Sequence, residues 1–486
     1  MPHLPHLPRP LPLAESAKSR RLPETGTPKK IAVIMSPTAA NAAKTTVQRS
    51  SFPNPLGWPA VAAQARIDER QTLLPNPLYQ GGPSRLPPLR HISFSFDLRE
   101  NPDAFYEPEN RNVLETLFPG TYGLSMDGMF LYFLQTQIPP KPWPRTIAGL
   151  PPYFAPEMSR HHTPRPTGTP ANQKNGSIAE NQNGRDMKDW EPLFHTIKDH
   201  FQDQGISVTE VIYLQSHVVI VLEHRDTDFA KLPYKAANLA CLYIYEDEIG
   251  RPATLSARRL TDPTPGNPDN SEYPNLQPGL RVASAYVPSK PGAFLPTTAG
   301  VLSPSRGFPD ECGRTVNHPV PSGGRDIGEL IMEITRTDIA LVKLRDTEKF
   351  SNITFQNDIL ESVQLKRLAS VKDIRAGDSV ILDSPDTGCL AGTFMITSLQ
   401  RVPTDDHLSP QQQWVFTTWN YMGQDSASTL PDGMCGSAIW NEDGDVLGFF
   451  RYAPKDGVMK DWCAGVAADE LIKKGFTLVN ASASPE

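Results

Sequence analysis

The chain has 486 residues, which exceeds the size at which one hydrophobic core stops growing, so a single-domain architecture is not expected. Its 50 prolines predict long loops and linkers, because proline neither donates to a strand ladder nor continues a helix. A formal net charge of −7 creates no field that attracts nucleic acid or anionic lipid, so neither is an expected partner.

Cysteine and histidine spacing bear on metal and cofactor binding. The five cysteines are widely spaced and include no CxxC pair, which argues against a disulfide framework, a redox motif or structural zinc. His161 and His162 are adjacent and have no cysteine or acid at ligand spacing. We therefore expect no metal site and no cofactor.

The start of the chain and its hydropathy bear on localisation. The proline-interrupted first residues are a poor secretory signal, and no apolar run reaches the roughly 20 residues that span a bilayer. We expect a soluble, cytoplasmic or nuclear protein with no membrane partner. The first 50 residues are rich in Ser, Thr, Ala, Lys and Arg, so an organelle transit peptide stays open as an alternative. The sequence leaves the oligomeric state open.

The N-terminal half is predicted to hold one folded module next to proline-rich segments. Residues 1–88 contain many prolines and few periodic apolar positions, so they are predicted to be disordered. Residues 89–260 combine strand-like and helix-like patterns and predict an α+β module. Within it, residues 156–187 are polar and proline-rich and predict a disordered insertion.

The second part of this module begins with a strong helix pattern. The segment WEPLFHTIKDHF at 190–201 places five apolar side chains on one helical face, namely Trp190, Leu193, Phe194, Ile197 and Phe201. Three β-branched runs follow, SVTEVIYL, HVVIVLEH and NLACLYIYED, and predict strands. We expect the helix to pack on the sheet that these strands form.

A predicted linker at 261–279 separates the module from an all-β domain at 280–480, and residues 481–486 form a tail. From Leu280 onward, short β-rich runs alternate with turns, among them RVASAYV, IALVKL, TFMITSL and VLGFF. A closing helix pattern, ADELIKKG, follows the last of them. This spacing is typical of an all-β barrel or sandwich.

Cys435 lies in the segment LPDGMCGSAIWNEDGDVLGFF at 430–450, where Gly433 and Gly436 allow a tight turn before a strand. The segment resembles the nucleophile loop of trypsin-like, chymotrypsin-fold (PA clan) peptidases, with cysteine in place of serine as in viral relatives. This resemblance implies that Cys435 holds the nucleophile position and that the N–H groups of residues 433 and 435 form an oxyanion hole. The alternative is an ordinary glycine turn with an inert thiol.

A second segment, TDIALVKL at 337–344, is similar to the Asp-Ile-Ala-Leu strand of the same family. This match implies that Asp338 holds the position of the aspartate that orients the catalytic histidine. Asp338 precedes Cys435, which is the family's chain order. The resemblance spans residues 280–480 and implies a chymotrypsin-like double β-barrel there.

The family's catalytic histidine has no counterpart at its expected place. The segment GAFLPTTAGVLSPS at 292–305 matches the family up to Gly300 and then has Val301, which cannot accept a proton. His318 is the best substitute base, although a histidine before proline in a glycine-rich loop is more often solvated than catalytic. Without a base, a free cysteine is only a few per cent thiolate at neutral pH, and the leaving amine lacks an acid.

The resemblance also implies a specificity pocket. Cys463 and Ala464 match the strand that lines the substrate cleft in bacterial and viral relatives. The base of the pocket would come from the residues just before the nucleophile loop, Ser428, Thr429 and Leu430. None of these is acidic, so a small or apolar side chain is the expected ligand residue.

Three functions stay open on these residues. The leading hypothesis is a catalytically impaired peptidase-fold protein, a pseudoprotease, whose inter-barrel cleft binds a peptide or protein ligand. The second is an active cysteine endopeptidase with Cys435 as nucleophile. The third is a structural scaffold or interaction protein whose cleft is filled by its own linker.

Overall fold

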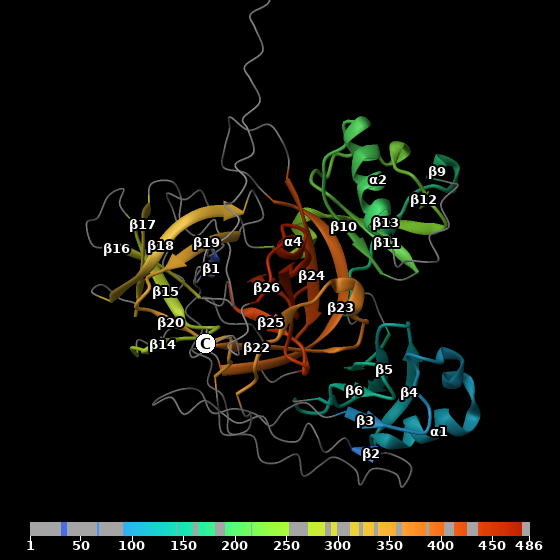
Figure 1. Ribbon diagram of the computed structural model, residues 1–486. Helices are drawn as coiled ribbons and strands as arrows, with labels where there is room; N and C mark the ends of the chain where they lie inside the picture. The colour runs from blue at the N-terminus through green and yellow to red at the C-terminus, as the bar shows by residue number, and fades with distance from the viewer. Residues whose placement is uncertain are drawn as a thin grey trace, which may run out of the picture.

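The computed structural model describes two short N-terminal segments and most of the chain from residue 91 to residue 478. The described ranges are 31–35, 66–67, 91–141, 143–158, 164–179, 190–214, 216–251, 271–286, 293–298, 312–319, 324–334, 339–355, 362–384, 388–402, 413–424 and 436–478. Figure 1 shows them as two small α+β units beside two β-sheet bodies. No helix in these ranges is long and apolar enough to cross a lipid bilayer.

The first unit packs a helix on a small sheet around an aromatic core. Helix α1 (Pro108–Leu117) contacts strand β4 (Thr121–Met126), which pairs with β5 (Leu131–Gln135), and β5 pairs with β7 (Pro152–Ala155). The Phe118 ring meets the Phe133 and Phe154 rings edge-on, with centroids 4.9 and 5.0 Å away. The remaining elements are β3 (His91–Ser93), η2 (Pro102–Tyr106) and β6 (Thr146–Ile147).

The second unit confirms the helix face predicted from the sequence. Helix α2 (Trp190–Asp203) buries the five apolar residues predicted to share that face. It packs on strands β10 (Val208–Tyr213), β11 (His217–Leu222) and β13 (Leu239–Tyr245). The shorter elements are β8 (Thr169–Pro170), η3 (Gln173–Asn175), β9 (Ser177–Ile178), η5 (Phe229–Lys231), β12 (Lys235–Ala236) and α3 (Glu246–Ile249).

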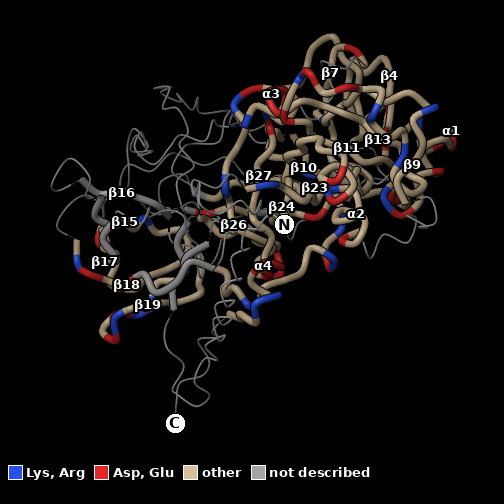
Figure 2. Tube along the Cα trace, turned by 90° about the horizontal axis from the view of Figure 1, so that it is seen from above, with Lys and Arg blue, Asp and Glu red and all other residues tan. Residues whose placement is uncertain are grey.

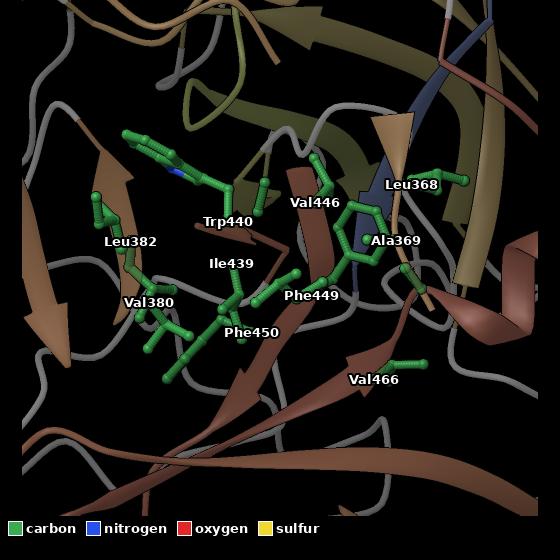
Figure 3. Close-up of a cluster of buried hydrophobic side chains, with 14 of the residues drawn as sticks. Leu368, Ala369, Val380, Leu382, Ile439, Trp440, Val446, Phe449, Phe450 and Val466 are labelled. Atoms are coloured by element: carbon green, nitrogen blue, oxygen red, sulfur yellow. The ribbon is translucent and has the colours of Figure 1, made fainter. Parts of the chain in front are cut away.

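A closed six-stranded antiparallel barrel forms the C-terminal body. Its strands are β22 (Ser379–Ser384), β23 (Gly388–Val402), β24 (Gln413–Tyr421), β25 (Ala438–Trp440), β26 (Asp445–Tyr452) and β27 (Trp462–Ala467). The ring closes because β22 pairs with both β25 and β23. Figure 3 shows the core, where Ile439 and Phe449 lie among aliphatic side chains and have no exposed surface.

A second six-stranded antiparallel sheet precedes it in the chain. It contains β15 (Arg281–Tyr286), β16 (Ala293–Thr298), β17 (Cys312–His318), β18 (Arg325–Ile334), β19 (Ile339–Leu344) and β1 (Ile31–Met35). Its end strands, β1 and β16, lie close together, as expected of a sheet curled into a barrel. This curled sheet, called the first barrel below, and the closed C-terminal barrel confirm the prediction that the C-terminal part of the chain is all-β.

Short elements connect and close the barrels. These are β14 (Asn275–Leu276), β20 (Lys349–Phe350), β21 (Arg367–Leu368), η7 (Val371–Asp373) and α4 (Asp469–Ile472). The C-terminal helix was predicted from ADELIKKG, and α4 covers its first turn. Its Glu470 carboxylate accepts the Phe416 N–H of β24 at 2.9 Å, which ties the helix to the barrel.

The structure differs from the predicted disordered segment 1–88 at two places. Strand β1 pairs with β19, and strand β2 (Arg66–Ile67) pairs with β3. The physical reason is local, since Ile31–Met35 is a run of five apolar residues that suits a strand despite its proline-rich surroundings.

The predicted insertion 156–187 and linker 261–279 also contain ordered parts. Within the insertion, β8 and β9 join the sheet of the second unit, and Trp462 donates its indole N–H to the Pro164 carbonyl at 2.7 Å. Within the linker, β14 pairs with β20 and buries Leu276. In both segments a few apolar or turn residues dock on neighbouring strands, a tertiary effect that composition does not reveal.

One strand joins the second α+β unit to the C-terminal barrel. Strand β23 pairs with β24 from residue 393 to residue 402. Its other edge carries β22 at residues 388–393 and β10 at residues 398–400. The sheet of the second unit is therefore continuous with the barrel wall. The predicted boundary between module and peptidase-like domain is crossed by backbone hydrogen bonds.

A buried carboxylate reinforces this junction. Glu210 on β10 has no exposed surface. Its side chain accepts the Trp419 indole N–H at 2.7 Å and the Ser398 hydroxyl, both from the barrel, and pairs with the Arg251 guanidinium. Arg251 also donates to Glu246 at 2.6 Å. A buried charge is tolerated only when it is paired and hydrogen-bonded, so this network fixes how the unit sits on the barrel.

We predict that Glu210→Gln lowers the free energy of unfolding by about 3 kcal/mol, because it leaves the Arg251 charge poorly compensated in the interior. Urea titration followed by tryptophan fluorescence measures this change. The matched control is Asp247→Asn, which removes a pair to Arg225 whose side chains are 62% and 58% exposed, and it should leave the midpoint unchanged. Equal midpoints for Glu210→Gln and the wild type would contradict the assigned role.

Candidate functional site

Most of the predicted site residues lie outside the described residues. These are Cys435, Gly433, Asp338, Val301, Ser428, Thr429 and Leu430. Three predicted residues are described, His318, Cys463 and Ala464, together with the chain on either side of the two family-like segments. The site is therefore built from these flanking strands and from the three described residues.

The chain directly after Cys435 is anchored to the C-terminal barrel. Gly436 has a backbone φ of +97°, a left-handed conformation that favours glycine. Its N–H donates to the Phe450 carbonyl, and the Phe450 N–H donates to the Ser437 carbonyl, both at 2.8 Å. Strand β26 thus holds the residue next to the predicted nucleophile in a fixed orientation.

The chain directly after Asp338 is equally constrained. Strand β19 begins at Ile339, which pairs with Ile334 of β18 on one side and with Met35 of β1 on the other. Leu341, two residues further, packs into the core cluster of the C-terminal barrel. The strand that follows the predicted orienting aspartate therefore links the two barrels.

His318 occupies a different environment from the predicted one. The sequence suggested a solvated loop, but His318 ends strand β17 and is only 2% exposed. Its Nε2 accepts the Tyr273 N–H at 3.1 Å, and its Nδ1 donates to the Arg281 carbonyl at 2.8 Å. Both ring nitrogens are engaged by backbone groups, so the geometry favours a structural role over that of a general base.

We predict that His318→Ala destabilises the first barrel by about 3 kcal/mol, because two buried backbone groups lose their partners. His318→Asn keeps a donor near the Nδ1 position and should lose less. Thermal unfolding of both variants measures the difference. A His318→Ala protein with wild-type stability but altered peptide cleavage would contradict the structural role and support the substitute-base hypothesis.

Cys463 and Ala464 were predicted to border a specificity pocket. Both lie on β27 and have no exposed surface. Cys463 is paired with Asn420 of β24 and packs in the barrel core, while Ala464 is paired with Trp419 and packs on the face toward the second unit. The two side chains point to opposite sides of the barrel wall and are not brought together in one open pocket.

The two fully buried thiols, Cys463 and Cys241, are expected to be unreactive. Burial raises the pKa of the Cys463 thiol to about 12 and that of the Cys241 thiol to about 12. We predict that iodoacetamide at neutral pH leaves both unmodified in the native protein, because only the thiolate reacts. Peptide mapping by mass spectrometry tests this, with a urea-unfolded sample as the positive control. Labelling of either thiol at its unfolded rate would contradict the burial described.

Two buried polar residues of the C-terminal barrel were missed by motif reasoning. The Ser437 hydroxyl and the Asn420 carbonyl oxygen are buried and have no hydrogen-bond partner within the described part of the chain. Such groups cost about 1–3 kcal/mol each and are uncommon in protein interiors. Ser437 stands two residues after Cys435 in the segment that resembles the nucleophile loop, and its polar side chain was the available signal.

The histidines bear on what this site can do chemically. Among the described residues of the two barrels, His318 is the only histidine, and the other described histidines belong to the α+β units. The described part of the barrels thus supplies the strands that adjoin the predicted nucleophile in the sequence, and both ring nitrogens of its one histidine are engaged. Proton transfer to a leaving amine has no assigned donor there.

Comparison with solved structures finds serine proteases at low identity. A glutamic acid-specific serine protease is 13% identical, covers 42% of this chain and 100% of its own, and has a TM-score of 0.30. The Nocardiopsis protease NAPase is 13% identical, with coverages of 43% and 100% and a TM-score of 0.27. The Cellulomonas bogoriensis chymotrypsin is 11% identical, with coverages of 42% and 90% and a TM-score of 0.23.

No protein-family model and no curated protein sequence matches the chain. The structural similarities are too weak to carry an argument about activity. The fold is described from its strand pairing alone. This chain contains a closed six-stranded barrel in the order β22-β25-β26-β27-β24-β23, and a second six-stranded sheet in the order β1-β19-β18-β17-β15-β16.

Proposed function

We propose that this protein is a peptidase-fold binding protein that retains a nucleophile-like loop and does not turn over peptides. The proposal rests on the hydrogen bonds of His318, whose two ring nitrogens bond to the backbone of Tyr273 and Arg281. The sequence adds Val301 at the position where the resemblance calls for histidine. Together they leave the predicted thiol without an assigned base.

The energetic consequence is large. In this fold the histidine deprotonates the nucleophile and later protonates the leaving amine. Loss of such a group in related enzymes reduces turnover by several powers of ten. A cysteine retains some nucleophilicity on its own, so it can react with an electrophile, but hydrolysis of an ordinary amide is not expected.

The ligand class follows from the fold and the charge distribution. A cleft between two barrels offers strand edges that can pair with an extended peptide through main-chain hydrogen bonds. The predicted pocket residues Ser428, Thr429 and Leu430 carry no charge, which favours a small or apolar side chain in the ligand. Figure 2 shows acidic and basic residues interspersed along the described chain, a distribution that gives no support to a nucleic-acid partner.

The test uses the full-length protein with a diverse mixture of synthetic peptides. Retained peptides are identified by affinity selection and new termini by mass spectrometry. We predict that the wild type, Cys435→Ala and Cys389→Ala retain the same peptides with affinities within about twofold, and that none of them generates new termini. Cys389 lies on β23 and serves as the matched cysteine control.

Two results would overturn the proposal. Cleavage by the wild type and by Cys389→Ala, but not by Cys435→Ala, would establish an active cysteine endopeptidase. The absence of both retained peptides and cleavage would favour a scaffold whose cleft is filled by its own chain.

A further inference from the structure

Strand β1 completes the first barrel from a remote part of the chain. All five of its residues pair antiparallel with β19, from Ile31 opposite Lys343 to Met35 opposite Ile339. The next strand of that sheet in the chain, β15, begins only at Arg281. Without β1, one whole edge of β19 would present unpaired backbone groups, because the other edge is used by β18.

The covalent connection of β1 differs from that of its sheet neighbours. Residues 36–65 separate it from β2, and β2 pairs with β3 of the first α+β unit rather than with the barrel. A connection of about 30 residues can span at most about 100 Å. It can therefore reach the same edge on a neighbouring molecule.

The pairing is also short. Each intramolecular hydrogen bond contributes only about 0.5–1.5 kcal/mol net to stability. A strand of five residues therefore stays paired with β19 largely because the chain connects the two covalently. A tether typically supplies an effective concentration in the millimolar range. An untethered copy of the same strand can compete when protein concentration approaches that range.

We propose that residues 31–35 are an exchangeable strand, and that the β19 edge of one molecule accepts this strand from a second copy of the chain. Exchange of an identical element keeps every native contact and is a low-cost route to a dimer. The sequence limits the pairing to this segment, since Lys29 and Lys30 precede it and Pro37 follows it. Charged residues and proline next to a strand typically prevent its edge from pairing with other strands.

The exchange would act beside the candidate site. Met35 pairs with Ile339, and Ile339 directly follows Asp338. The end of the exchanged strand therefore supports the start of β19, where the predicted orienting aspartate is attached. The proposal itself does not depend on whether the site turns over peptide.

The first experiment tests the pairing within one full-length chain. Ile31→Cys with Lys343→Cys joins two residues that lie directly opposite each other in the register of β1 and β19. Ala32→Cys with Lys343→Cys is the matched control, because a one-residue offset points the side chain to the other face. Cys312, Cys389 and Cys435 are replaced by serine in both. Mild oxidation should crosslink the first pair and not the second.

The second experiment tests exchange between chains. Tagged full-length Ile31→Cys is mixed with untagged Lys343→Cys, unfolded and refolded together at rising concentration, and then oxidised. We expect a disulfide-linked heterodimer at least tenfold more abundant than with Ala32→Cys in place of Ile31→Cys, increasing with concentration. Ile34→Cys with Ala340→Cys, another register pair, replaces the first pair should either variant fail to refold.

Either of two outcomes overturns the proposal. If the register pair does not crosslink within one chain, β1 does not occupy this edge. If it crosslinks within one chain but the mixed chains give no more heterodimer than the control at any concentration, the strand is a fixed part of the barrel and is not exchanged.

Discussion

The pairing of strand β10 with strand β23 is the constraint on which the arrangement of this protein depends. It makes the sheet of the second α+β unit continuous with the wall of the C-terminal barrel. The Glu210 carboxylate lies at this junction and accepts hydrogen bonds from Ser398 and Trp419. A buried carboxylate has few satisfactory positions, so the junction is specific as well as stable.

The C-terminal barrel also contacts the strands that follow the two family-like segments. Strand β26 receives the Gly436 N–H and thereby orients the chain that leaves Cys435. Strand β19, which begins directly after Asp338, belongs to the first barrel and reaches the core of the C-terminal barrel through Leu341. Both family-like segments are therefore attached to rigid strands. The peptide binding proposed above would rely on these strands to hold the site.

The first barrel is assembled from distant segments. Its sixth strand comes from residues 31–35, and β14 from the predicted linker pairs beside it with β20. His318 belongs to the same assembly, because it joins strand β17 to the backbone of Tyr273 and Arg281. A histidine in this position stabilises the barrel. Because its two ring nitrogens bond to the backbone, His318 is not available as a base, which is why we propose that the protein does not turn over peptides.

The sequence predicts local elements better than long-range ones. The helical face of α2 and the strands of the C-terminal barrel follow from periodicity alone, and the fold class follows from the segments around Asp338 and Cys435. The order in β1, β9 and β14 was not predicted, because a proline-rich composition masks short runs that become strands only by docking on a partner. The burial of His318 was missed for the same reason, since its neighbours Pro319 and the glycines after it suggest a loop.

Hydrogen exchange followed by mass spectrometry tests the central claim that the second unit and the C-terminal barrel form one cooperative body. The backbone amides of β10 and of β23 near residues 398–400 should exchange through the same opening, with equal free energies, and Glu210→Gln should lower both together. Rapid exchange in β10 while β23 stays protected would contradict the account, because it would mean that the unit detaches while the barrel remains folded.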